Sequence, residues 1–168
     1  MSAWIICERS HAMTVMREGG CTCGAVRYRM DGPPMIVHAC HCTWCQRETG
    51  SAFAINAVIE AARVTVLCGQ PVAVMTPSAS GRGQRIWRCP ACHVALWSNY
   101  PDAGPKVNFI RVGTLDDPGA LPPDIHIFTA TRLAWVQLPD GVPAVPEFYD
   151  RADIWSADAL KRWAATRG

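Results

Sequence analysis

The distribution of cysteine constrains this chain more than any other feature of its sequence. Seven of its 9 cysteines lie in three tight groups, while Cys7 and Cys68 stand alone. The groups are Cys21 and Cys23; Cys40, Cys42 and Cys45; and Cys89 and Cys92. The odd number, the close spacing and a start without a convincing secretory signal indicate a reducing compartment, for which we expect the cytoplasm. Thiolates that bind metal are therefore expected instead of disulfides.

Two of the groups, Cys21-x-Cys23 and Cys89-x-x-Cys92, have the form of two half-sites far apart in the sequence. Four thiolates form a closed tetrahedral zinc site, which has no open position for chemistry. Such a site would connect the start of the sheet to its middle and contribute to folding directly. The alternatives are four reduced thiols or an iron–sulfur cluster, which the same ligands can bind.

The third group, Cys40-x-Cys42-x-x-Cys45, supplies three sulfurs instead of four. Three protein ligands leave one tetrahedral position open, as in a catalytic zinc site. A thiol or a carbonyl oxygen could occupy that position. The alternative is a closed structural site, in which the fourth ligand is one of the histidines His38, His41 and His93. We thus expect two zinc ions per chain.

Short apolar runs separated by turn residues predict a mainly β fold, a sandwich or a barrel-like sheet assembly. Of all residues 49% are hydrophobic and 18% are charged, so the chain has enough apolar surface for a core. The expected strands lie within residues 26–30, 35–39, 52–59, 63–67, 71–75, 84–88, 106–112 and 124–129. We divide the chain into a leader (1–18), which is either loose or an edge strand near its end, a zinc-binding β domain (19–150) and a C-terminal helix packed on the domain (151–168).

Capping signals predict two short helices. Thr43 and Gln46 form a capping box, with Gly50 closing the segment. Ser156 is the expected N-cap of a helix that ends near Thr166.

Several function classes are disfavoured by composition. The formal net charge of +2 is too small to argue for a nucleic-acid partner, and no apolar run is long enough to span a membrane. Among the remaining residues, Cys68 is expected to be a buried apolar group, and His11 and His126 to be surface or strand polar residues. Trp44 and Arg47 flank a site sulfur and are candidate substrate-binding residues. The sequence does not indicate an oligomeric state.

The three cysteine motifs stand in a context that resembles the glutathione-dependent formaldehyde-activating enzyme (GFA) family, also called the centromere protein V family. The matching motifs are Gly20-Cys21-x-Cys23-Gly24-x-Val26-Arg27-Tyr28, Cys40-His41-Cys42-x-x-Cys45-x-x-x-Thr49-Gly50-Ser51, Cys89-x-x-Cys92, His126-Ile127-Phe128, Trp135 and Asp140-Gly141-Val142-Pro143. They extend from about Arg17 to Phe148. Two departures stand out: His93 replaces a usual Gly, and Ala134 replaces a common Pro.

The resemblance implies a zinc-binding Mss4-like fold of short antiparallel strands with a structural and a catalytic zinc site. Cys21, Cys23, Cys89 and Cys92 would hold the structural ion, and Cys40, Cys42 and Cys45 the catalytic one. It also implies carbon–sulfur lyase activity, the reversible joining of formaldehyde to glutathione as in S-(hydroxymethyl)glutathione synthase. The expected partners are a small thiol and an aldehyde. The alternatives are a non-enzymatic zinc-stabilised binding module and a redox enzyme that uses Cys7 or Cys68.

Overall fold

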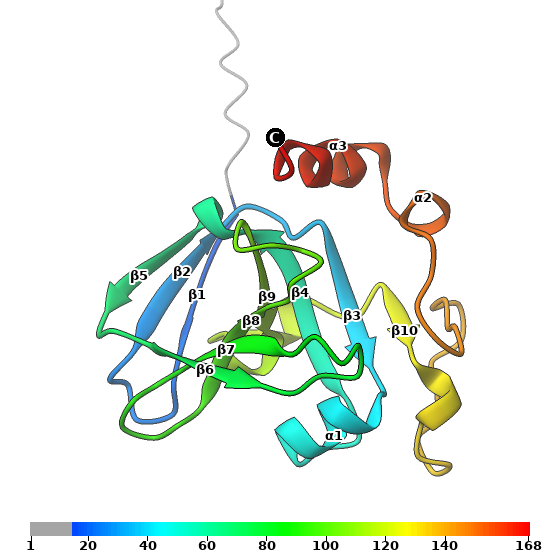
Figure 1. Cartoon of the computed structure of the whole chain (residues 1–168), viewed down its shortest axis with the longest axis horizontal. Coiled ribbons are helices and arrows are strands. Elements are labelled where there is room, and N and C mark those ends of the chain that lie inside the picture. The colour runs from blue at the N-terminus through cyan, green and yellow to red at the C-terminus, as the bar shows by residue number, and fades with distance from the viewer. Residues whose placement is uncertain (1–14) are drawn as a thin grey trace, which may run out of the picture.

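Strands dominate the computed structural model of the chain, which describes residues 15–168 (Figure 1). The strands are β1 (Met16–Gly20), β2 (Arg27–Asp31), β3 (Ile36–Cys40), β4 (Ala54–Glu60), β5 (Val64–Cys68), β6 (Val72–Thr76), β7 (Gln84–Arg88), β8 (Ala95–Asn99), β9 (Val107–Arg111) and β10 (Ile125–Ile127). The helices are α1 (Thr43–Thr49), α2 (Arg151–Ile154) and α3 (Ala157–Ala165), with 3₁₀ turns η1 (Ala61–Arg63), η2 (Val112–Thr114), η3 (Pro118–Ala120) and η4 (Thr129–Thr131).

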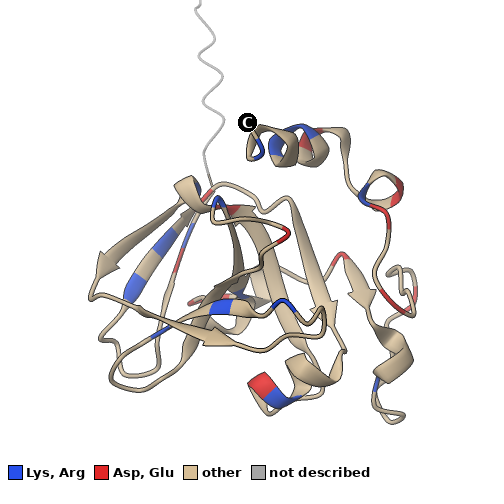
Figure 2. Cartoon of the chain, viewed as in Figure 1, with Lys and Arg blue, Asp and Glu red and all other residues tan. Residues whose placement is uncertain are grey.

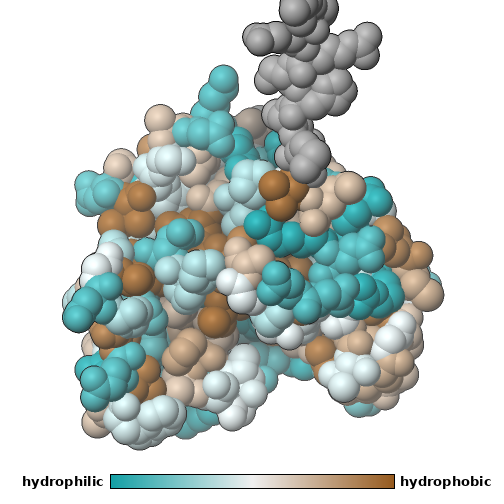
Figure 3. Space-filling model, turned by 180° about the vertical axis from the view of Figure 1, so that it is seen from behind, coloured by the Kyte–Doolittle hydropathy of each residue, from teal (hydrophilic) through white to brown (hydrophobic). Residues whose placement is uncertain are grey.

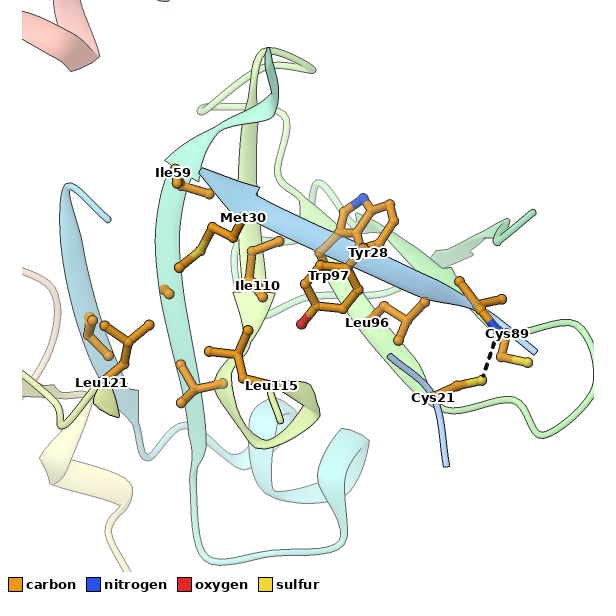
Figure 4. Packing of buried hydrophobic residues seen from close by; sticks show 14 residues of the cluster. Cys21, Tyr28, Met30, Ile59, Cys89, Leu96, Trp97, Ile110, Leu115 and Leu121 are labelled. Carbon is orange, nitrogen blue, oxygen red and sulfur yellow. Dashed lines mark hydrogen bonds between the residues drawn. The ribbon is translucent and has the colours of Figure 1, made fainter. Parts of the chain in front are cut away.

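The strands form a small sheet, in the order β1-β2-β5, and a large sheet, in the order β10-β3-β4-β9-β8-β7-β6. Neighbouring strands are antiparallel, except that β10 runs parallel to β3. Tyr28 and Met30 of β2 are fully buried in a core cluster with Ile59, Trp97 and Ile110 of the large sheet (Figure 4). This core therefore joins the two sheets.

A second core cluster involves the C-terminal segment. Ile125 of β10 and Val58 of β4 belong to it, together with Trp155 and Ala159 from the segment that contains α2 and α3. α1 follows the end of β3, and α3 lies at the opposite end of β3 and β4, where Arg162 binds Glu60 (Figure 1). The three sulfurs of Cys40, Cys42 and Cys45 are part of this cluster.

The mainly β expectation is confirmed, and the expected strand ranges contain the observed strands to within one or two residues. β8 was not anticipated. Met16–Gly20 forms β1, paired with β2, so the last residues of the expected leader belong to the small sheet. Residues 1–14, with Cys7 and His11, lie outside the described residues.

The helix at 43–49 is present, but its predicted cap is wrong. Cys42 is the N-cap, and its sulfur accepts a hydrogen bond from the Cys45 amide at 3.4 Å. Gln46 instead donates from Nε2 to the carbonyl oxygens of His41 and Thr131. A metal-binding sulfur can thus replace a hydroxyl as helix cap. The Ser156 cap of α3 and the left-handed Gly50 after α1 are confirmed.

Cys68 was expected to be buried, but it is exposed at the end of β5. β5 is an edge strand of the small sheet, and its outer residues have no covering layer. Charged residues of both signs are spread over the molecule, and on the face seen from behind hydrophobic and hydrophilic residues are intermixed (Figures 2 and 3). None of the helices in residues 15–168 is long and apolar enough to cross a membrane.

Candidate metal centres

Two turns from different sheets bring four cysteines together. Cys21 and Cys23 lie in the turn between β1 and β2, and Cys89 and Cys92 lie in the turn between β7 and β8. Their four sulfur atoms all lie within 4.8 Å of one another. Figure 4 shows Cys21 and Cys89 side by side at the edge of the first core cluster. The cluster therefore links the small sheet to the large one.

The two turns have the same local design. Gly24 donates its amide to the Cys21 carbonyl, and His93 donates its amide to the Cys89 carbonyl, each at 3.0 Å. Both residues adopt a left-handed conformation, with φ of 76° and 60° respectively. The Val26 amide also donates to the Cys21 sulfur at 3.2 Å. Each turn thus aims two sulfurs at a common point.

The spacing of the sulfurs fits a metal ion. Sulfurs about 2.3 Å from a tetrahedral zinc lie roughly 3.8 Å apart. The Cys21 and Cys23 sulfurs are 3.5 Å apart, and the Cys23 and Cys89 sulfurs are 3.7 Å apart. A backbone hydrogen bond from Val94 is the main cause that lowers the pKa of Cys92 to about 6. The donor set therefore suits a thiophilic divalent ion such as zinc.

The second cluster is built by consecutive elements. Cys40 ends β3, Cys42 caps α1, and Cys45 lies in the first turn of α1; all three are buried, and their sulfurs lie within 4.8 Å of one another. Hydrogen bonds from the Cys40 and Cys45 thiols lower the pKa of Cys42. Because the Cys40 thiol donates a hydrogen bond to the Cys42 sulfur, the pKa of Cys40 is raised. The three soft donors fit a thiophilic divalent ion such as zinc.

The histidines considered as a fourth ligand point elsewhere. His38 Nε2 lies 2.6 Å from the Tyr149 hydroxyl, and His41 Nε2 lies 2.9 Å from Nδ1 of His126. His93 belongs to the turn of the four-cysteine cluster. Within residues 15–168 the group around Cys40 consists of three cysteines and no histidine.

The His41–His126 pair was not anticipated. His126 was expected to be a surface or strand polar residue, and it lies on strand β10, but in the interior. Both side chains are buried and stack, and Phe53 packs 4.9 Å from the His41 ring. The parallel pairing of β10 with β3, which places His126 beside Ala39, creates this contact. The motif His126-Ile127-Phe128 was the only sequence signal for it.

A family model for "Glutathione-dependent formaldehyde-activating enzyme" matches residues 16–131, well over half of the chain. The chain belongs to this GFA family. A Halomonas elongata protein with the same family description is 28% identical over 130 residues, which cover 74% of this chain and 82% of that protein. A crystal structure of a Rhodobacter sphaeroides protein covers 59% of this chain and 87% of its own, at 20% identity and a TM-score of 0.43.

All seven clustered cysteines lie within the residues that the family model matches. The mainly β fold with two such clusters is consistent with the Mss4-like zinc-binding fold. The family model ends at residue 131, so the resemblance at Trp135 and at residues 140–143 lies beyond it.

Two open cavities lie beside α1 of this GFA family member. One, of about 710 Å³, is lined by Phe53, Leu133, Val136 and Trp135, whose side chain is 72% exposed. The other, of about 550 Å³, lies between α1 and the Cys89–Cys92 turn. Trp44 and Arg47 are exposed on α1 and line neither cavity. Trp135, by contrast, lines the first cavity, although the sequence named it only as part of the family resemblance.

Proposed function

We propose that the chain reversibly joins a small aldehyde to a small thiol, as a carbon–sulfur lyase related to S-(hydroxymethyl)glutathione synthase. The observation that carries the proposal is the difference between the clusters: four sulfurs in one and three in the other, with no histidine of residues 15–168 completing the second. The four-cysteine cluster would hold a structural zinc ion. Cys40, Cys42 and Cys45 would hold a catalytic one with a position left for substrate.

Addition of a thiol to an aldehyde forms a carbon–sulfur bond, breaks the carbonyl π bond and transfers the thiol proton to oxygen. When bound, zinc supplies a positive charge that keeps a substrate thiol deprotonated. The protein must then stabilise the developing alkoxide and protonate it. Water or a nearby side chain can do this.

Tyr100 is the side chain near the cluster that we propose as the donor of that proton. Its ring packs edge-on against Phe109 at 4.8 Å, and both residues pack against the core cluster that contains the three cysteines. Burial is the main cause that raises the pKa of Tyr100, and the charge of Cys45 adds to it. The hydroxyl therefore remains protonated at neutral pH and can donate a hydrogen bond.

The substrate contacts are also proposed. Trp44 and Arg47 would contact the substrate from the exposed side of α1, next to Cys45. Glutathione and formaldehyde are the thiol and aldehyde suggested by the family description and by the name of the Halomonas elongata relative.

The test is the exchange rate between free formaldehyde and its thiol adduct, measured by NMR exchange spectroscopy with glutathione and a panel of other thiols. The zinc-loaded chain should accelerate exchange with at least one thiol, and Cys42→Ser should return the rate to background. Cys68→Ser, which removes an exposed thiol outside both clusters, should keep the wild-type rate. If no thiol exchanges faster at full zinc occupancy, the proposal is wrong.

A further inference from the structure

Arg111 is a buried cation that has no carboxylate partner among residues 15–168. Its side chain, at the end of β9, is 6% exposed. Nη1 donates to the Asn56 side-chain oxygen at 2.5 Å and Nη2 to the Ser98 hydroxyl at 3.3 Å, while Nε has no hydrogen-bond partner. Among the described residues, Arg111 takes part in no salt bridge. Every partner of its charge is thus neutral.

Two other shielded arginines are paired with carboxylates. Arg162 pairs with Glu60 through two hydrogen bonds of 2.8 and 2.7 Å, and Arg88 pairs with Glu48. A buried charge that lacks an opposite charge is costly, so such groups are normally paired or bound to a ligand. We therefore expect a negative group other than a carboxylate to compensate the charge of Arg111.

The strand register places such a negative group on the same face of the sheet. Arg111 pairs with Asn56 across β9 and β4, and Cys40 pairs with Ala54 across β3 and β4. Ala54 and Asn56 are two residues apart, so their side chains point to one face, together with those of Cys40 and Arg111. Two carboxylates are also near, but Glu60 on this face is paired with Arg162, and Glu48, which lines the same cavity as Arg111, is paired with Arg88. The sulfurs of the three-cysteine cluster remain for Arg111, whose charge acts on Cys45.

The charges of that cluster do not cancel on their own. Three thiolates exceed the charge of one divalent ion, so the loaded site keeps one uncompensated negative charge in a buried position. One guanidinium neutralises it. Both the cluster and Arg111 act on the hydroxyl of Tyr100, which is consistent with a shared environment.

We propose that Arg111 is the buried counter-ion of the Cys40–Cys42–Cys45 cluster and that its charge sets the affinity of this cluster for a thiophilic divalent metal ion. The inference rests on the metal-binding part of the proposed function and does not depend on the reaction. Asn56 and Ser98 hold the guanidinium in place through neutral groups, which leaves its charge available to the thiolates.

The test measures the transfer of zinc from the loaded, full-length chain to a chromogenic chelator. Asn56→Asp is the most informative variant, because it keeps the side-chain shape and gives Arg111 a carboxylate of its own. We expect Asn56→Asp and Arg111→Met to weaken one of the two zinc sites about tenfold, the effect of one nearby charge in a partly solvated interior. Arg111→Lys should retain most of the affinity.

Arg162→Met is the matched control, since it removes a shielded arginine that binds the opposite end of β4. It should lower stability and leave both zinc affinities unchanged. If Arg111→Met fails to fold, Asn56→Asp decides, because a purely structural role for Arg111 predicts wild-type zinc affinity in that variant. If Asn56→Asp binds zinc at both sites with wild-type affinity, Arg111 is not the counter-ion, whereas the proposed metal site still stands. A wild-type chain that binds only one zinc ion overturns the proposed metal site itself.

Discussion

His93 is one of two non-glycine residues within residues 15–168 that have a left-handed backbone conformation. Its φ of 60° lies in the left-handed region, which costs a residue with a Cβ about 1–2 kcal/mol. His93→Gly removes this strain but adds flexibility to the unfolded chain. We expect the free energy of unfolding of the zinc-loaded protein to rise by about 1 kcal/mol, measured by urea denaturation.

Gly24, at the equivalent place in the partner turn, is the control. A Cβ added there meets no atom within 4 Å, so Gly24→Ala tests backbone conformation alone. It should lower the free energy of unfolding by about 1 kcal/mol. If His93→Gly is destabilising instead, the imidazole makes a contribution that outweighs the strain.

Residues whose role depends on local spacing were predictable, and residues whose role depends on strand pairing were not. Cys40, Cys42 and Cys45 are close in sequence, so any fold that turns there brings their sulfurs together. The His41–His126 contact requires β10 to run beside β3, and the surroundings of Arg111 require the register of β4 and β9. Neither pairing can be read from hydrophobic alternation.

An ion pair between Arg162 of the C-terminal helix α3 and Glu60 at the end of β4 holds this helix against the large sheet. Burial alone would raise the pKa of Glu60, but the hydrogen bonds from Arg162 outweigh it and lower that pKa below its ordinary value of 4.5. The stabilising effect is therefore complete above the unfolded-state pKa and is lost as pH falls through the lower folded-state value. Arg162→Met should cost about 2 kcal/mol at pH 7 and progressively less below pH 4.5.

The measurement is denaturant unfolding of wild type and variant at several pH values. Their difference isolates the ion pair, because loss of zinc in acid affects both proteins. Lys161→Met, an exposed change on the same helix, should cost little at any pH. A cost of Arg162→Met that stays constant from pH 7 to pH 3.5 would show that packing, not charge, holds α3.

Helix caps could be predicted from the sequence where a local side-chain or backbone preference determines them. The predictions of Ser156 as N-cap and of Gly50 as the residue that ends α1 were correct, because a hydroxyl cap and a left-handed glycine depend only on neighbouring residues. Thr43 was wrong because the sulfur of Cys42 takes the capping position one residue earlier. The strand β8 was overlooked because Ala95–Asn99 contains few alternating apolar residues.

At the scale of the whole molecule, the four-cysteine cluster is a cross-link between two sheets. The two sheets and their order depend on contacts between distant segments, which sequence alone did not establish. The pairing of the Cys21–Cys23 turn with the Cys89–Cys92 turn was nevertheless predicted, because two half-sites of two cysteines need each other to complete four ligands.

The two clusters should therefore differ in what their loss does to the fold. Cys23 and Cys89 are 66 positions apart, whereas Cys42 and Cys45 are three apart. By loop-closure entropy alone, the longer connection constrains the unfolded chain by about 3 kcal/mol more. Cys89→Ser should therefore give unfolded or insoluble protein, while Cys42→Ser should keep the β fold with one zinc ion, and Cys68→Ser should retain both ions. Zinc content per chain together with circular dichroism tests all three. If Cys42→Ser unfolds while Cys89→Ser stays folded with one zinc ion, the structural and catalytic roles of the two clusters are reversed.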